Sequence, residues 1–246
     1  MRSSRRRSPA STSSWRSLGK LVKALLVIPA YNEAENIERV VDEIAADYPR
    51  YDYIVVNDGS KDETADICRK RGYNLLDLPV NLGLAGAFQT GVKYALMHGY
   101  DCVVQFDADG QHLPEYLDSM VDALEGADIV LGCRAFEEDK PTGMRMVGSK
   151  LLSGMIRVTT GKRIVDPTSG MRAYNARAMN ELAFGPNLGP EPDTIAYLMK
   201  RKGLKVAEVP VRMAERIAGT SYLNWSSSSA YMFRMTVSVM FIQLFR

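Results

Sequence analysis

The stretch DCVVQFDADGQH, residues 101–112, decides how the rest of the chain is interpreted. Its first half, DCVVQF, is a short, mostly apolar run of the kind found in strands buried inside a sheet. Polar side chains then follow at every second position, at Asp107, Asp109 and Gln111. Because the strand fixes their position, this pattern predicts two carboxylates and an amide at the edge of a sheet, where a ligand can reach them.

Short apolar runs alternate with helical patterns on both sides of this stretch. The predicted strands are KALLVIPAY, YIVVND, NLLDLP, VVQFDAD, DIVLGCR and, late in the chain, KVAEVPVRM. The predicted helices span about 33–47, 62–71, 86–97, 114–124 and 194–202, and a longer helical stretch follows DIVLGCR. This spacing predicts an α/β fold with a mostly parallel sheet and helices on both faces.

Local signals predict where some of these elements begin and end. Ser60 with Glu63, and Asn32 with Glu35, have the spacing of a capping box, which predicts a helix start at each pair. Pro210 has no N–H for a sheet ladder, so the last strand should lie at an edge or end there.

The first 20 residues differ from the rest in charge. They hold six Arg and Lys residues and no acidic residue, so the remaining chain has a net charge of −4, although the whole carries +2. Their Ser/Arg/Pro composition predicts a disordered basic tail over 1–20 without a secretory signal. The tail either has no role or contacts acidic lipid or nucleic acid. A basic tail alone is weak evidence, and no nucleic-acid partner is predicted.

The rest of the composition is that of one globular domain, expected over 21–225. Three widely spaced cysteines without CxxC spacing predict free thiols in a reducing cytoplasm. The sequence contains no run of eighteen uncharged apolar residues, so no transmembrane span is predicted. The Met- and Phe-rich segment 226–246 is predicted to form a short amphipathic helix, either in the membrane interface or packed on the core.

Three predicted strands end in polar residues, in IPAYNE, VVNDGS and QFDADGQ. Converging carboxylates repel one another unless a cation or hydrogen-bond donors lie between them. A hard divalent cation such as Mg²⁺ or Mn²⁺ suits these oxygen ligands and keeps coordination positions for phosphate oxygens. Alternatively, the acids only cap turns and the next helix. His112 is expected to face solvent rather than to act as a ligand.

Six segments together resemble glycosyltransferase family 2, most closely its dolichol- or polyprenol-phosphate sugar synthase branch. They are, in order, LLVIPAYNEAENI, YIVVNDGSKDET, NLGLAGAFQTGVKYA, FDADGQH, GCR and DPTSGMRAYN. The resemblance covers about residues 22–225. It implies a Rossmann-like GT-A fold that binds a nucleoside diphosphate sugar through a divalent metal and transfers the sugar with inversion.

The resemblance also implies roles for individual residues. The nucleotide sugar would be bound by Pro29, Tyr31, Glu33, Asp58, Asn81, Gly86, Asp107, Arg134 and Arg216. The metal would be held by Asp107, Asp109 and Gln111, and the acceptor by Ser169 and Arg172. The residues expected to carry catalysis are Asp107, Asp109, Asp193 and Arg216.

The chemistry of the acceptor decides what else the site needs. A lipid phosphate is anionic near neutrality and needs orientation by cations, which Ser169 and Arg172 in DPTSGMR would suit, although DPTSG can also be a plain turn. A hydroxyl acceptor needs a general base, and Glu191 and Asp193 precede a predicted helix. An N-cap is the other interpretation of Asp193.

The sequence thus predicts a hexosyltransferase that moves a sugar from a UDP- or GDP-sugar to a polyprenyl (dolichyl or undecaprenyl) phosphate at the cytoplasmic face of a membrane. The alternative is inverting transfer to a hydroxyl of a lipid-linked saccharide or other glycan, with Asp193 as base. PAYNEAENI after the first strand lacks the glycines of a nucleotidyltransferase or a dinucleotide-binding loop. The absence of QxxRW argues against a processive polysaccharide synthase. A non-catalytic scaffold is the remaining alternative.

Overall fold

The computed structural model describes residues 22–134, 144–186, 188–214 and 238, and from residue 144 to 148 the backbone alone. The predicted tail over 1–20, Arg216 and all of the predicted helix over 226–246 except Ser238 lie outside the described residues.

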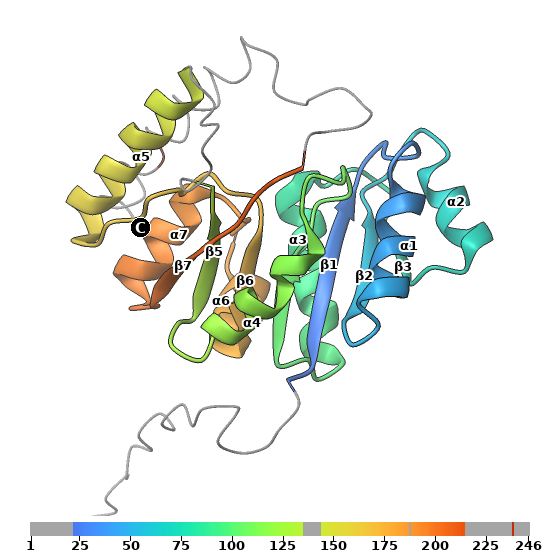
Figure 1. The fold of residues 1–246 in the computed structure, drawn as a ribbon, viewed down its shortest axis with the longest axis horizontal. Helices are drawn as coiled ribbons and strands as arrows, with labels where there is room; N and C mark the ends of the chain where they lie inside the picture. The colour runs from blue at the N-terminus through green and yellow to red at the C-terminus, as the bar shows by residue number, and fades with distance from the viewer. Residues whose placement is uncertain (1–21, 135–143, 187, 215–237, 239–246) are drawn as a thin grey trace, which may run out of the picture.

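The described strands form one sheet in the order β3-β2-β1-β4-β6-β5-β7 (Figure 1). Their bounds are β1 Ala24–Ala30, β2 Asp52–Asn57, β3 Leu75–Asp77, β4 Cys102–Gln105, β5 Ile129–Cys133, β6 Arg172–Asn175 and β7 Val206–Pro210. Only the ladders of β6 with β4 and with β5 are antiparallel within this sheet. The predicted mostly parallel sheet is confirmed, but the sequence reasoning missed β6.

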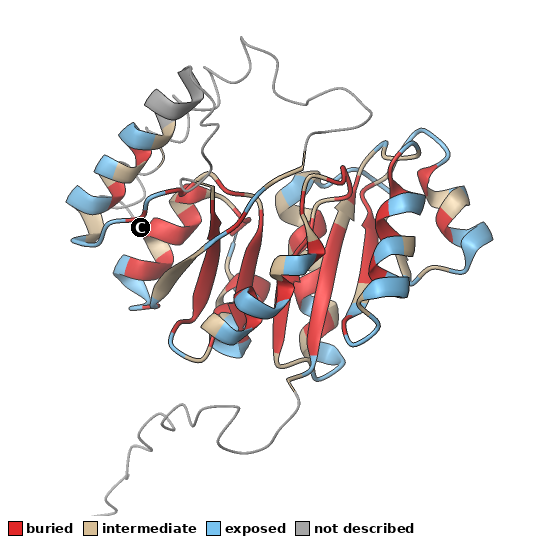
Figure 2. Cartoon of the chain, viewed as in Figure 1, coloured by how far each residue is buried: buried red, intermediate tan, exposed pale blue. Residues whose placement is uncertain are grey.

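Helices cover both faces of this sheet, as predicted. The helices are α1 Ile37–Asp47, α2 Thr64–Arg71, α3 Gly83–Met97, α4 Leu117–Ala123, α5 Met144–Thr160, α6 Ala176–Phe184 and α7 Pro192–Arg201, with a 3-10 turn at Pro114–Tyr116. One apolar layer joins the sheet to α3, α5, α6 and α7, and the other joins it to α1, α2 and α4. Figure 2 shows the strands as the buried centre between these two layers.

The alternation of side chains along β1 explains the two layers. Leu25 and Val27 belong to the layer under α3, while Leu26 and Ile28 belong to the layer under α1. All four side chains are buried, and each contributes about 1.5–3 kcal/mol relative to an exposed position. Gly91 lets α3 approach closely, because a Cβ there would lie 2.3 Å from a methyl carbon of Val27.

The strand order creates a natural ligand-binding crevice. From β1 the chain adds β2 and β3 on one side and then returns to place β4 on the other side of β1. Loops after neighbouring strands therefore diverge at the carboxyl ends of β1 and β4, which is where open α/β sheets bind ligands. These ends lie along the upper edge of the sheet in Figure 1.

The two predicted capping boxes are wrong. Helix α1 begins at Ile37 after Asn36, and α2 begins at Thr64 after Glu63, with no side-chain capping hydrogen bond at either start. The residues from Glu33 form a turn in which the Glu33 carbonyl accepts the N–H groups of Asn36 and Ile37. The oxygens of Asn32 and Ser60 are used between loops instead.

Other local expectations are confirmed. Pro210 is the last residue of β7, and β7 lies at the edge of the sheet. Cys68, Cys102 and Cys133 are free and buried. Burial raises the pKa of the Cys68 thiol to about 11, so this thiol is protonated at neutral pH. No helix in the described part of the chain has the length and apolar character needed to cross a membrane.

Candidate active site

The acid loop, residues 107–112, leaves the end of β4 at the crevice. Asp109 is only 7% exposed, and its Oδ1 accepts the Gln111 N–H at 3.0 Å, which closes a tight turn. Gly110, between them, has a φ of 76°, a conformation that glycine adopts without strain. Asp107 and Gln111 are partly exposed. The loop therefore combines one buried carboxylate with a carboxylate and an amide that solvent can reach.

The loops after β1 and β2 are tied together by hydrogen bonds from backbone to side chain. The Asn32 N–H donates to Ser60 Oγ at 2.9 Å, and the Lys61 N–H donates back to Asn32 Oδ1 at 2.8 Å. The Glu33 N–H donates to Thr64 Oγ1 at 2.9 Å. These bonds fix the backbone that carries the predicted nucleoside-binding residues before any ligand is present.

Two further features of these loops were not foreseen. Asn32 has a φ of 56°, an unfavourable conformation for a residue with a Cβ that asparagine tolerates better than most. The Ala34 N–H donates to Asp62 Oδ2 at 3.1 Å. Burial raises the pKa of Asp62, but hydrogen bonds from Thr64 and Ala34 outweigh it, and the net pKa is lowered. In the sequence, Ser60, Asp62 and Thr64 look only like helix-start residues.

Asp58 anchors the loop that precedes α3. It is buried, and its Oδ1 accepts the Leu82 N–H at 2.7 Å. The side-chain amide of Asn81 donates to the Asp58 carbonyl at 3.1 Å. A Cβ at Gly86 would lie 2.5 Å from the Cβ of Leu82, so glycine permits this close turn. Asp58, Asn81 and Gly86, all predicted to bind nucleotide, therefore come together in one loop contact.

Arg134 follows β5 and forms a bidentate ion pair with Asp166 of the DPTSG segment. Its Nε lies 2.7 Å from Asp166 Oδ2 and its Nη2 lies 2.9 Å from Oδ1. The Arg134 N–H and the Thr168 hydroxyl donate to the same carboxylate. Burial raises the pKa of Asp166, but the hydrogen bonds and the charge of Arg134 outweigh it and lower the pKa below its usual range. The guanidinium is thus held in one orientation, with 37% of the side chain exposed.

A second carboxylate binds the backbone at the start of the DPTSG segment. The carboxylate of Glu208, on β7, accepts the backbone N–H groups of Val165 and Asp166 at 2.8–2.9 Å. Neither Asp166 nor Glu208 was singled out in the sequence. Their spacing from Arg134 along the chain gives no local signal, because the loops and the strand that carry them meet only in the folded protein.

Ser169 and Arg172 are buried beside the same segment. The Arg172 guanidinium, 2% exposed, donates from Nε to the Ser169 carbonyl at 2.8 Å and from Nη2 to the Pro167 carbonyl at 3.0 Å. Arg172 Nη1 and Ser169 Oγ have no hydrogen-bond partner among the described residues. In this structure Arg172 shapes the DPTSG turn, and its predicted contact with the acceptor stays a prediction.

Asp193 lies in the first turn of α7, whose N-cap is Glu191, so the N-cap interpretation of Asp193 is wrong. Its Oδ1 accepts the Thr194 N–H at 2.8 Å, and its Oδ2 accepts the Ser238 hydroxyl at 2.6 Å. Both carboxylate oxygens are therefore engaged by the protein. Each carboxylate oxygen keeps a further lone pair, so the role of Asp193 as a general base stays a prediction.

The expectation for His112 is wrong, because the side chain is buried rather than solvent-facing. It is 4% exposed and packs edge-on against Phe106, with ring centroids 5.5 Å apart. Its backbone pairs with Met213, which follows β7 and brings the end of the described domain over the acid loop. No pattern in the sequence indicates this long-range pairing.

The side chains at the acid loop fit a divalent cation, as an open rather than a closed site. The described residues hold no group of three or more His, Cys, Asp or Glu side chains placed to enclose a metal ion. Two carboxylates and one amide oxygen are hard ligands, and they leave positions that phosphate oxygens and water can occupy. This donor set is typical of a cation that is bound together with a phosphorylated ligand.

Comparisons with known proteins agree with this geometry. A family model described as glycosyl transferase family 2 matches residues 25–183. The chain is 32% identical to an undecaprenyl-phosphate mannosyltransferase of Micrococcus luteus, over 82% of this chain and 88% of that protein. It is 29% identical to a polyprenol monophosphomannose synthase of Mycolicibacterium smegmatis, over 87% and 85%.

A solved structure supports the same fold. Glucosyl-3-phosphoglycerate synthase from Mycobacterium tuberculosis, in complex with Mn²⁺, UDP-glucose and phosphoglyceric acid, matches with a TM-score of 0.68 at 21% identity, over 97% of this chain and 86% of that one. The family model spans more than half of the chain. The sheet of this protein carries the acid loop at the topological switch point. The chain therefore belongs to glycosyltransferase family 2 and is a glycosyltransferase with a GT-A fold.

Proposed function

We propose that this protein transfers a sugar from a UDP- or GDP-sugar to a polyprenyl phosphate, with inversion at the sugar carbon and with Mg²⁺ or Mn²⁺ bound. The observation that carries the proposal is the acid loop at the switch point between β1 and β4, facing the two tied loops that follow β1 and β2. The relatives named for mannosyl transfer to polyprenyl phosphates support the acceptor class.

The donor would lie across the carboxyl ends of β1, β2 and β4. Pro29, Tyr31 and Glu33 would contact the nucleoside from the first loop. Asp58 would contribute from the second, with Asn81 and Gly86 shaping the adjacent turn. Because Ser60 and Thr64 already hold this backbone, little of it has to be ordered when the nucleotide binds.

The metal would be held by Asp107, Asp109 and Gln111. A bound divalent cation would neutralise the negative charge that grows on the diphosphate as the bond to the sugar breaks. Arg134 would add a fixed positive charge close to the same group, and Asp166 keeps it oriented. Arg216, predicted for a similar role, lies outside the described residues.

The acceptor phosphate would act as the nucleophile through one of its anionic oxygens. It forms the new bond at the sugar carbon while the bond to the nucleoside diphosphate breaks, so the pair of electrons leaves with the diphosphate. No proton has to be removed from an ionised phosphate. In this reaction Asp193, which accepts hydrogen bonds from Thr194 and Ser238, would not be needed as a base. The relatives named for mannosyl transfer to polyprenyl phosphates favour this acceptor over a hydroxyl, for which Asp193 would be the base.

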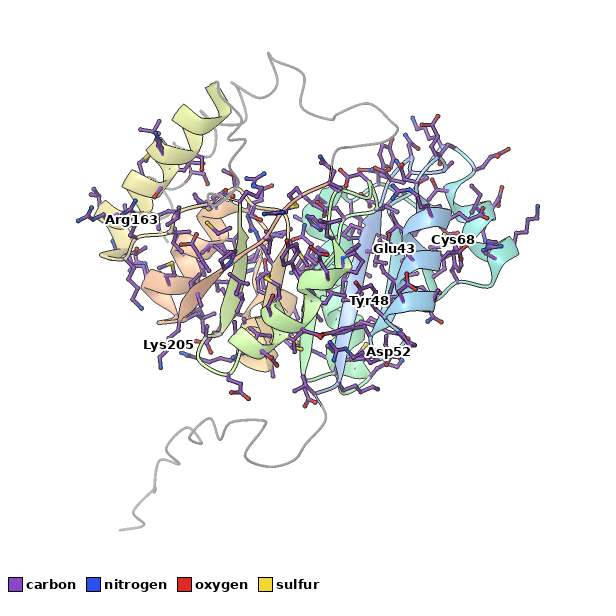
Figure 3. All side chains as sticks on the ribbon, in the orientation of Figure 1. Glu43, Tyr48, Asp52, Cys68, Arg163 and Lys205 are labelled. Atoms are coloured by element: carbon purple, nitrogen blue, oxygen red, sulfur yellow. The ribbon has the colours of Figure 1, made fainter. Side chains whose placement is uncertain are left out.

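Helix α5 supplies a surface suited to a lipid acceptor. Its sequence contains no acidic residue, and Lys150, Leu151, Arg157 and Val158 are exposed at spacings that place them on one face. Leu151 is 53% and Val158 87% exposed. Arg163, just beyond the helix, lies on the outside of the molecule in Figure 3. A basic and apolar face of this kind would rest on an anionic membrane surface, which we propose as the working location of the enzyme at the cytoplasmic side.

The test is a transfer assay with defined components. The protein is incubated with Mn²⁺, undecaprenyl phosphate and a panel of UDP- and GDP-sugars, and the product is identified by mass. A lipid product whose sugar is released by mild acid is expected. Asp109→Asn and addition of EDTA should each abolish it, whereas Asp66→Asn on the exposed surface of α2 should not. A product formed in EDTA, or a sugar resistant to mild acid, would refute the proposal.

A further inference from the structure

Both ring nitrogens of His112 lie close to polar atoms of Asp107. Its Nδ1 accepts the Asp107 N–H at 2.9 Å, so the neutral imidazole carries its proton on Nε2. That Nε2 lies 3.4 Å from Asp107 Oδ2. One buried ring therefore faces both the backbone and the carboxylate of the first acid in the loop.

The other carboxylate oxygen of Asp107 is held from the opposite side. Gln105, the last residue of β4 and 2% exposed, donates from Nε2 to Asp107 Oδ1 at 3.1 Å. Each oxygen of Asp107 thus faces an N–H group on a buried side chain. About a third of the Asp107 side chain stays exposed, so lone pairs remain for an incoming ligand.

Gly170 and Phe106 pack closely against this arrangement. A Cβ at Gly170 would lie 2.8 Å from Asp107 Oδ2 and 3.0 Å from His112 Nε2, so the glycine backbone packs directly on both groups. The ring of Phe106 packs edge-on against the ring of His112.

We infer that His112 is a positioning residue which, with Gln105, fixes the carboxylate of Asp107 before the nucleotide sugar and its cation bind. The inference rests on the proposed function, in which Asp107 binds the cation. Partners that orient a metal ligand contribute through that ligand, and removing one weakens metal binding about 10- to 100-fold. His112 touches neither substrate nor cation in this role.

Three substitutions separate positioning from packing. His112→Phe keeps the ring on Phe106 and loses both polar contacts. His112→Asn can still accept the Asp107 N–H, and His112→Gln can still offer an N–H to the carboxylate. His98→Phe is the matched control, because the His98 side chain is exposed, lies away from the acid loop, and among the described residues contacts Tyr94, through its Nδ1 and its ring.

The assay is Mn²⁺ binding, followed by the electron paramagnetic resonance signal of free Mn²⁺ in the presence of UDP and, separately, GDP. His112→Phe should raise the Mn²⁺ Kd about 10- to 100-fold, the Asn and Gln variants should lie between it and wild type, and His98→Phe should match wild type. In the Asp107→Ala background, His112→Phe should cause no further loss. If His112→Phe does not fold, Gln105→Leu removes the other N–H that faces Asp107 and should also raise the Mn²⁺ Kd.

Several outcomes would overturn the inference. Wild-type Mn²⁺ affinity in both His112→Phe and Gln105→Leu would do so, and so would a full additional loss from His112→Phe in the Asp107→Ala background, since the effect would then not pass through Asp107. A wild-type protein that binds no Mn²⁺ with either nucleotide would contradict the proposed function itself. The two failures are therefore distinguishable.

Discussion

Replacing Asp166 by Asn should lower stability and weaken donor binding together, because this carboxylate holds Arg134. Two guanidinium N–H groups reach it at 2.7 and 2.9 Å. The Arg134 N–H and the Thr168 hydroxyl add hydrogen bonds at 3.2 and 3.0 Å. An asparagine keeps one acceptor oxygen but turns an amide N–H₂ toward the other guanidinium nitrogen. Hydrogen bonds to charged groups contribute about 1.5–3 kcal/mol each, and partial exposure of Arg134 reduces their loss, so we expect a destabilisation of about 3 kcal/mol.

Thermal unfolding provides the stability measurement. For a chain of this size, about 3 kcal/mol corresponds to a decrease in Tm of roughly 6–12 °C. Asp128→Asn is the matched control, because Asp128 is equally buried at the opposite end of β5 and pairs with Arg177 at 3.2 Å. The control should lose comparable stability but leave the KM for the nucleotide sugar unchanged, whereas Asp166→Asn should raise that KM about tenfold. Equal KM values in both variants would refute the link between Asp166 and the donor.

The pH dependence of this stability has a defined sign. The pKa of Asp166 is lower in the folded protein than in the unfolded chain, where it is about 3.9. The stabilisation from its ionised form is therefore fully present above that value and is lost as the pH falls through the folded pKa. The difference in unfolding free energy between wild type and Asp166→Asn should be constant from pH 5 to 8 and should shrink below about pH 4. A difference that grows on acidification would contradict this account.

Two other substitutions test the shape of the site. Gly170→Ala introduces a Cβ at 2.8 Å from Asp107 Oδ2 and 3.0 Å from His112 Nε2, and we expect a loss of about 1–3 kcal/mol in a urea unfolding experiment together with weaker Mn²⁺ binding. An unchanged Mn²⁺ affinity would mean that the loop yields freely. At Asn32, with its φ of 56°, Gly should be tolerated better than Ala by about 1 kcal/mol, because both lose the bond to the Lys61 N–H but only Ala is strained there. Equal stability of the two variants would show that the backbone relaxes.

The position of the acid loop could be predicted from sequence because it depends on local information. An apolar strand must be buried, its polar end must reach the surface, and the alternation of strands and helices requires parallel pairing. Asp107 and Asp109 follow β4 at the switch point, as these rules require. The individual roles assigned to the nucleotide- and acceptor-binding residues stay predictions.

The environment of the site could not be predicted in the same way. His112 is buried because Met213 pairs with it after β7 has returned to the sheet, about a hundred residues later in the chain. Strand β6 was missed because RAYN is four residues long and has no apolar run, and its antiparallel entry between β4 and β5 depends on the completed sheet. Tertiary contacts decide both features, and neither leaves a periodic pattern.

The wrong capping boxes have a more specific physical cause. Hydroxyl and carboxylate side chains satisfy exposed backbone N–H groups wherever these occur, and a helix start is only one such place. After β1, the N–H groups of Asn32 and Glu33 donate to the oxygens of Ser60 and Thr64 in the loop that follows β2. The residue types are those of a cap, but the partner lies in another loop.

This use of polar side chains explains why so many polar groups are buried at one edge of the sheet. Asp58, Asp109, Asp166, His112 and Arg172 are each less than a tenth exposed, and burying each costs free energy unless it is bonded. Each has a partner that fixes a loop rather than a helix or a strand. The free-energy cost of burying polar groups is therefore concentrated at the ends of the strands. The two layers between sheet and helices stay apolar, and the hydrogen bonds hold the loops in place. A site that must stabilise charge on a departing diphosphate gains most from groups already in place, because reorienting them during the reaction would raise the barrier. The same reasoning predicts that stabilising substitutions will be found in the two apolar layers, whereas substitutions of these five residues will reduce stability and activity together.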